Sequence, residues 1–241
     1  MTISKSAVRN LLLRAMSPDD FARLKPHLEP VTLSLKEVLV EANQPIEHVY
    51  FIEEGLASVV AISPDNERLE VEHIGREGMT GEPVILSVNQ TPLQTFIQVA
   101  GSGLRVRAED LSAAMEASPS LKALLLRWMQ VLMIQTAQST LANGRYTIQE
   151  RLARWLLMCH DRLDRDDLPL THEFLSLMLG VRRSGVTEAL HVLEGVQVVK
   201  TGRGRIHLLD RERLEDIAGG CYGLSEAEYT KLIGVPLKHQ V

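Results

Sequence analysis

Histidine, cysteine and acidic side chains most often catalyse reactions or bind metals, and this sequence places few of them together. His172-Glu173 lacks the second histidine of a zinc-binding His-Glu-x-x-His motif, because Ser176 stands at that position. Cys159-His160 is a single adjacent pair with no further ligand at metal-binding spacing. No Gly-x-Ser-x-Gly nucleophile motif and no phosphate-binding loop occur. We therefore expect no enzyme, no catalytic residue, no metal site and no cofactor.

A second set of polar residues lies along one face of a predicted amphipathic helix. From residue 182 to 193, Val186, Ala189, Leu190 and Leu193 recur at helical spacing and predict a buried face. The opposite face carries Arg183, Ser184, Thr187, Glu188 and His191. This arrangement predicts a helix whose apolar side packs on the protein while its polar side stays free for a partner.

The segments on either side of this helix support the same interpretation. Thr171 is predicted to cap a shorter helix, and Gly180 supplies the left-handed turn that ends it. Two helices joined by a tight turn form a helix-turn-helix, whose second helix can lie in a major groove. The strands VQVVK and RIHLLD follow, joined by Thr201–Gly204, and this hairpin carries three basic residues, Lys200, Arg203 and Arg205. We predict a winged helix-turn-helix that contacts double-stranded DNA.

The first half of the chain predicts a different kind of body. From Val31 to Arg107, short runs rich in Val, Ile and Leu alternate with turn residues, which is typical of a small antiparallel β-roll. From Pro83 to Leu104 no charged residue occurs, and a glycine-bracketed turn ending in Glu82 precedes this stretch. Such a turn can present backbone N–H groups to a ligand, although it can equally be a loop that closes the roll. The predicted effector pocket consists of Gly81, Glu82, Gln94, Thr95, Gln135 and Thr136.

Between the two bodies lies a long uncharged helix. Residues 119–143 contain no Gly, no internal Pro and only Lys122 and Arg127 as charges, and apolar residues occupy nearly every face. A helix apolar all round is buried on more than one side. One side can cover the roll, and the other favours a second copy of the same helix, although the core of a larger monomer is the alternative. The sequence predicts an α+β protein with a roll domain over 1–116, a dimerisation helix over 117–144 and a DNA-binding domain over 145–241.

Composition narrows the class of protein. The net charge is −5, but residues 145–214 carry 12 basic against 10 acidic residues, whereas residues 1–144 carry 12 against 17. An acidic chain does not coat nucleic acid indiscriminately, yet it can read one site through a local basic patch. Two cysteines and an initial apolar run of only three leucines, Leu11–Leu13, indicate no disulfide framework and no signal peptide. We expect a cytoplasmic protein that does not insert into a membrane.

The order of roll, long helix and winged helix-turn-helix resembles the Crp/Fnr superfamily of bacterial transcription regulators over nearly the whole chain. The resemblance is carried by Gly55, GREGMTGE at 75–82, RLARWLL at 151–157, LTHEFLSLMLGVRRSGVTEALHVLE at 170–194 and the GRGRI wing. It implies a homodimer on a near-palindromic operator, RNA polymerase as a further partner and an effector in the roll. By position it makes Thr171 a phosphate contact and Arg183, Ser184, Thr187 and Glu188 the base-reading face. Arg182 joins the expected DNA contacts, and Arg183 can bond O6 and N7 of guanine together.

The sequence also departs from the family pattern. Cyclic-nucleotide-binding members hold the cyclic phosphate with an arginine, and Gln94-Thr95 stands where that arginine is expected. Glu188 replaces a frequent arginine, and Gly185 lies inside the second helix, where we expect it to allow a close approach to DNA. We therefore predict that cyclic AMP is not the effector and that a neutral effector, or none, occupies the roll. The alternative function is a ligand-binding signalling module that acts through protein contacts without DNA.

Overall fold

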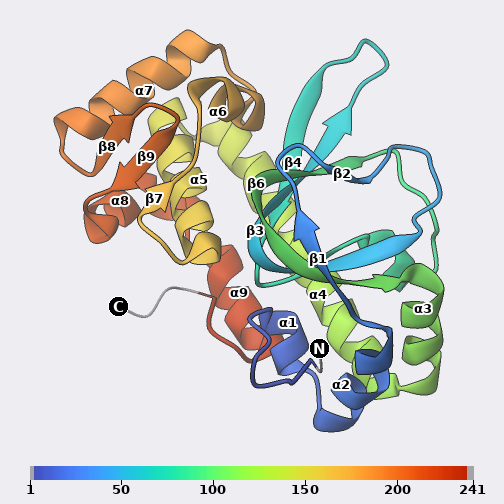
Figure 1. The fold of residues 1–241 in the computed structure, drawn as a ribbon. Coiled ribbons are helices and arrows are strands. Elements are labelled where there is room, and N and C mark those ends of the chain that lie inside the picture. The colour runs from blue at the N-terminus through green and yellow to red at the C-terminus, as the bar shows by residue number, and fades with distance from the viewer. Residues whose placement is uncertain (1–2, 238–241) are drawn as a thin grey trace.

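The computed structural model describes residues 3–237, and its N-terminal half is an antiparallel β-roll (Figure 1). Its sheet has the order β1-β6-β3-β4, with β2 also paired to β6 and β5 to β3. The strands are β1 (Glu29–Leu33), β2 (Val38–Val40), β3 (His48–Ile62), β4 (Arg68–Ile74), β5 (Met79–Thr80) and β6 (Gln94–Arg107). The 3-10 helix η2 (Glu82–Leu86) follows β5. The alternating strands predicted between Val31 and Arg107 are therefore present as one sheet.

Helices cover one end and one side of the roll. They are α1 (Leu11–Ala15), α2 (Pro18–Leu24), α3 (Ala108–Ala117) and the long α4 (Pro119–Arg145), with the 3-10 helix η1 (Lys25–His27) after α2. Ser118 caps α4, accepting a hydrogen bond from the backbone N–H of Leu121. Trp128 of α4 is buried, and a Cβ on Gly78 would lie 2.1 Å from its ring, so only glycine lets that turn pack here. The side of α4 that faces the roll is thus fixed by close packing.

The C-terminal half is the predicted helix-turn-helix with its hairpin. It contains α5 (Ile148–Leu163), α6 (His172–Leu179), α7 (Arg183–Gly195) and α8 (Arg211–Ala218), and a sheet of order β7-β9-β8. Its strands are β7 (Asp167–Leu168), β8 (Val199–Gly202) and β9 (Arg205–Leu208). Cys159 is fully buried in its core, where burial raises the pKa of the thiol well above its usual value. The predicted α+β class, with a roll followed by a winged helix-turn-helix, is confirmed.

The chain returns to the first body at its end. After the 3-10 helix η3 (Gly219–Cys221), α9 (Leu224–Ile233) packs on α4 within the hydrophobic core of the roll. Tyr229 is fully buried, its ring meets Trp128 edge-on at 6.3 Å, and its hydroxyl donates to the Glu77 carbonyl at 2.9 Å. The sequence division placed this helix in the DNA-binding domain, whereas its side chains pack with the roll. The domain boundaries predicted at residues 117 and 145 stay a prediction.

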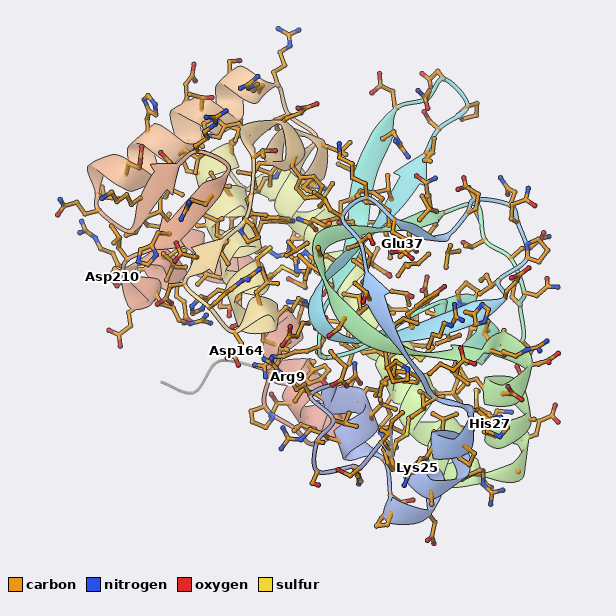
Figure 2. The ribbon with its side chains drawn as sticks, viewed as in Figure 1. Arg9, Lys25, His27, Glu37, Asp164 and Asp210 are labelled. Carbon is orange, nitrogen blue, oxygen red and sulfur yellow. The ribbon has the colours of Figure 1, made fainter. Side chains whose placement is uncertain are left out.

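A buried ion pair joins the two bodies. The Arg162 guanidinium of α5 donates to Glu77 Oε1 at 2.7 Å and to Gln135 Oε1 of α4 at 2.6 Å. The Arg162 and Glu77 side chains are 3% and 1% exposed, and the Gly75 N–H also donates to the Glu77 carboxylate. Nearer the surface, Asp164 Oδ2 lies 3.8 Å from Arg9 Nη2 (Figure 2). The turn after β4, the long helix and the first helix of the DNA-binding body therefore meet at one guanidinium.

No helix among residues 3–237 is both long enough and apolar enough to cross a membrane. The longest helix, α4, has a mixture of apolar and uncharged polar side chains along its length.

Replacing Glu77 by Gln is expected to lower the free energy of unfolding by about 3–5 kcal/mol, because the variant leaves Arg162 buried without its counter-charge. Urea denaturation followed by circular dichroism measures this loss. Glu54→Gln is the matched control: it removes a carboxylate whose side chain is 54% exposed and which pairs with Arg9, so it should cost less than about 1 kcal/mol. Equal losses in the two variants would show that the buried pair does not hold the bodies together.

Candidate nucleic-acid interface and effector pocket

The helix-turn-helix begins and ends as its sequence predicts. Thr171 Oγ1 accepts a hydrogen bond from the Phe174 N–H at 3.2 Å and so caps α6. Gly180 ends α6 at φ 60°, in the left-handed conformation that favours glycine. The fixed turn places α7 on the outer edge of the molecule, with β8 and β9 beside it (Figure 1). Thr171 is exposed, so its hydroxyl proton remains available to an outside acceptor.

The outer face of α7 holds most of the residues predicted to contact DNA. Arg182, Arg183, Ser184 and Glu188 are exposed, and no described acidic residue forms an ion pair with either arginine. Thr187 is half-buried: its Oγ1 donates to the Arg183 carbonyl at 3.1 Å and lies 3.1 Å from His172 Nδ1. Thr187 is therefore partly committed to the protein, whereas the other four side chains are free to meet a partner.

Gly185 lies inside α7, as its sequence position predicted, and its missing side chain faces α5. A Cβ at this residue would come within 3.3 Å of Ile148 Cδ1 at the start of α5. Its missing side chain thus allows α7 to pack closely on α5, and the expectation that Gly185 brings α7 closer to DNA stays a prediction.

The hairpin beside α7 carries the remaining predicted DNA contacts. Lys200, Arg203 and Arg205 are all exposed, and within residues 3–237 none of them forms an ion pair. Glu194 at the end of α7 anchors the hairpin, since its carboxylate accepts from both the N–H and the hydroxyl of Thr201 at 2.6 Å. These two hydrogen bonds lower the pKa of Glu194 and keep it charged. The hairpin is therefore fixed against α7 with its cations pointing outward.

Two acidic side chains interact at the predicted effector pocket, the buried Glu82 and the half-buried Glu72. Gly81, at φ 78°, opens η2, and Glu82 follows it with a side chain that is 7% exposed. Glu82 Oε2 has no hydrogen-bond partner among the described residues, and burial raises the pKa of this carboxyl. The neighbouring carboxylate is Glu72 of β4, which accepts a hydrogen bond from Thr136 Oγ1 at 2.7 Å.

The structure brings together only part of the predicted pocket. Thr136 meets Glu72, and Gln135 is buried between Arg162 and the carbonyl of His73, to which its Nε2 donates at 3.3 Å. Thr95 is buried in β6, paired with β2 and β3. Gln94 lies at the start of β6 and faces away from Glu82, because its amide bonds Glu41 and Arg68 at the surface. The inclusion of Gln94 in an enclosed pocket is therefore not supported by its position.

Two polar residues of this region were missed from the sequence. Glu72 follows Glu70 by two residues on β4, so period-two alternation places both on one face, and only the structure shows that Glu72 meets Thr136. The hydroxyl of Thr80 is fully buried and has no partner among the described side chains. Within residues 3–237 no group of three or more His, Cys, Asp and Glu side chains could hold a metal ion.

Comparison with known proteins supports the two-body description. The model of the cyclic nucleotide-binding domain matches residues 30–118, and that of the Crp-like helix-turn-helix domain matches residues 150–217. The transcriptional regulator LdrP of Thermus thermophilus is 26% identical over 198 residues, covering 77% of this chain and 95% of LdrP. FixK2 of Bradyrhizobium japonicum superposes with a TM-score of 0.70 at 20% identity, covering 80% of this chain and 98% of FixK2. A putative cAMP-binding regulatory protein of Silicibacter pomeroyi superposes with a TM-score of 0.61 at 18% identity, covering 90% and 98%.

Folding stability is expected to fall as the pH rises from about 4.5 to about 7. Burial and the charge of Glu82 raise the pKa of Glu72 from 4.5 to about 7. The folded protein keeps this proton at pH values where the unfolded chain has lost it, so deprotonation costs stability, by about 3 kcal/mol. The Glu72→Gln variant should therefore lose about 3 kcal/mol less of its free energy of unfolding than wild type over this pH range. Urea denaturation between pH 5 and 8 measures the difference. The exposed-carboxylate variant Glu109→Gln is the control, and an unchanged pH dependence in Glu72→Gln would contradict the assignment.

Proposed function

The chain belongs to the Crp/Fnr superfamily of bacterial transcription regulators, and we propose that it regulates transcription by binding a specific DNA site through α7 and the adjacent hairpin. The observation that carries this proposal is the exposed face of α7, where Arg182 and Arg183 have no acidic partner among the described residues. Unpaired arginines on an outward-facing helix are suited to guanine edges and phosphates.

Charge supports specific rather than general DNA binding. The whole chain has a net charge of −5, so attraction to DNA must come from a local surface. Lys200, Arg203 and Arg205 supply that surface beside α7, and Thr171 at the start of α6 offers its hydroxyl to a phosphate. We assign base reading to Arg183, Ser184 and Glu188, with Thr187 restricted by its bonds to the protein. The exposed basic side chains of α7 and the hairpin favour this function over signalling through protein contacts alone.

We further propose that the protein acts as a homodimer through α4. The side of this helix away from the roll exposes Leu126, Met133 and Leu141, with 42%, 63% and 44% of their surfaces accessible. Leu126 and Met133 are seven residues apart, and Gln130 and Ala137 lie between and after them at heptad spacing. A second copy of the same helix covers such a stripe and gives the two α7 helices twofold symmetry, which matches a near-palindromic operator.

We propose that the roll does not bind a cyclic nucleotide. Two acidic side chains interact here, the buried Glu82 and the half-buried Glu72, and neither can supply the positive charge that a cyclic phosphate needs. No Lys or Arg occurs between Glu82 and Arg105, and Lys122 and Arg127 of α4 are exposed. An anion there would be desolvated next to two acids, so an effector of this pocket has to be neutral or donate hydrogen bonds.

Arg183→Ala is expected to cost about 1–3 kcal/mol at the base pair that Arg183 reads and to relax the preference for that base. Arg203→Ala should instead weaken binding to all sequences similarly, because it removes a phosphate contact. Competition gel shifts with operator variants measure both effects. An unchanged site preference in Arg183→Ala would show that this residue does not read a base.

Met133→Glu is expected to convert the dimer into a monomer, because it places two negative charges against each other at the centre of the helix pair. Sedimentation equilibrium at micromolar concentration measures the mass. Leu209→Glu, at a residue 51% exposed outside α4, should remain dimeric. Wild-type protein that sediments as a monomer would disprove the dimer.

Cyclic AMP and cyclic GMP are both expected to give no binding heat in isothermal titration calorimetry at micromolar protein concentration, since the pocket offers them acids and no cation. Low-micromolar binding of either one, coupled to tighter operator binding, would refute this prediction.

A further inference from the structure

A groove of about 740 Å³ lies between the outer surface of the roll and α6. The roll contributes residues of β2 and β6, including Val38, Phe96 and Gln98, and α6 contributes Phe174 and Leu177. Both bodies form the walls of this groove, and neither Glu72 nor Glu82 lines it. Its volume suits a small organic molecule.

The apolar part of the groove is formed by aromatic and aliphatic side chains. The rings of Phe96 and Phe174 meet edge-on, with centroids 6.4 Å apart and planes at 84°. Val38 and Leu35 at the rim are 44% and 60% exposed, which is unusual for branched apolar side chains on a single small surface. Two half-buried rings and two exposed aliphatic groups favour a ligand with an aromatic body.

One buried polar group of the groove lacks a partner. Gln98 is 4% exposed, and its Oε1 lies 2.6 Å from the hydroxyl of Ser58, which also bonds Glu70 Oε2 at 2.6 Å. Gln98 Nε2 has no hydrogen-bond partner among the described residues. A buried donor without an acceptor destabilises a protein, so a ligand that offers an acceptor atom gains free energy here.

The charged side chains of the groove favour an anion. Its lining contains two cations, Lys36 and Arg68, and one acid, Glu173. The Arg68 guanidinium donates to the neutral amide oxygen of Gln94, whose Nε2 is held by Glu41 at 3.0 Å. No described carboxylate forms an ion pair with Lys36 or Arg68. Arg68 is thus oriented by a neutral partner and keeps its charge available.

We propose that this groove binds a small aromatic carboxylic acid. The ring lies on Phe96, Phe174 and Val38, the carboxylate meets Arg68, and Gln98 Nε2 donates to an acceptor of the ligand. The groove also regulates DNA binding, an inference that rests on the proposed function. Thr171, the expected phosphate contact, lines the same groove. A carboxylate bound in the groove therefore places negative charge near Thr171, and the bound ligand keeps α6 packed on the roll. Occupation of the groove therefore weakens operator binding.

The test is isothermal titration calorimetry of the full-length protein with three probes of equal body: 4-phenylbutyrate, 4-phenylbutanol and 4-phenylbutylamine. Wild-type protein should bind 4-phenylbutyrate about tenfold more tightly than the alcohol, the gain of one charge-assisted hydrogen bond, and the amine least. Arg68→Gln should remove that preference, and Val38→Asp should weaken binding of the acid by adding a like charge at the rim. Arg165→Gln, an exposed cation outside the groove, should bind like wild type.

Two results overturn the proposal: no binding of 4-phenylbutyrate to wild type at millimolar concentration, or equal affinity in wild type, Arg68→Gln and Val38→Asp. Gel shifts on the same samples test the groove and the DNA-binding function separately. If the protein binds its operator but not the acid, the ligand-binding proposal for the groove is wrong and the DNA-binding function stands. If the protein binds the acid but no operator, the proposed DNA-binding function is wrong and ligand binding in the groove is supported. Operator binding that 4-phenylbutyrate weakens in wild type but not in Arg68→Gln supports both.

Discussion

The buried pair of Glu77 and Arg162 is the interaction on which the arrangement of the two bodies depends. A buried ion pair adds little net stability, because desolvation offsets its attraction, but removing one partner is costly. Its main effect is therefore geometric: it allows one orientation of α5 relative to the turn that follows β4. Gln135 of α4 completes the contact at 2.6 Å. The same turn leads into Glu82 within a few residues, so the interior of the roll and the DNA-binding body share one short piece of backbone.

The distribution of acids and cations then decides what each surface can bind. We propose that the acidic side chains of Glu72 and Glu82 disfavour an anion in the roll, although this domain matches the model of the cyclic nucleotide-binding domain. The cations that are free lie elsewhere, on α7 and its hairpin, and at the rim of the groove beside α6. Each free cation is exposed, so its attraction acts on partners from solution. We therefore propose that anions are recognised at the outer surfaces and not in the core of the roll.

Local sequence patterns predicted those parts of the molecule whose structure is determined locally. The spacing of Val186, Ala189, Leu190 and Leu193 predicted α7, and Thr171 and Gly180 predicted the two ends of α6. Contacts between distant segments could not be predicted in this way. Tyr229 packs on Trp128 from about a hundred residues away, and Gln94 turns to the surface because Glu41 and Arg68 lie there. Only the folded arrangement shows that Glu72 and Glu82 are neighbours, since period-two alternation indicates a face and not the residue opposite.

Selection of binding sites from random double-stranded DNA by the full-length protein tests the central claim, sequence-specific recognition by a pair of α7 helices. We expect enrichment of a near-palindrome whose half-sites are centred about 10 base pairs apart, one turn of the double helix. Twofold symmetry would place the two α7 helices in successive major grooves on one side of the DNA. Enrichment of no sequence at all, at salt concentrations where non-specific binding is weak, would contradict it.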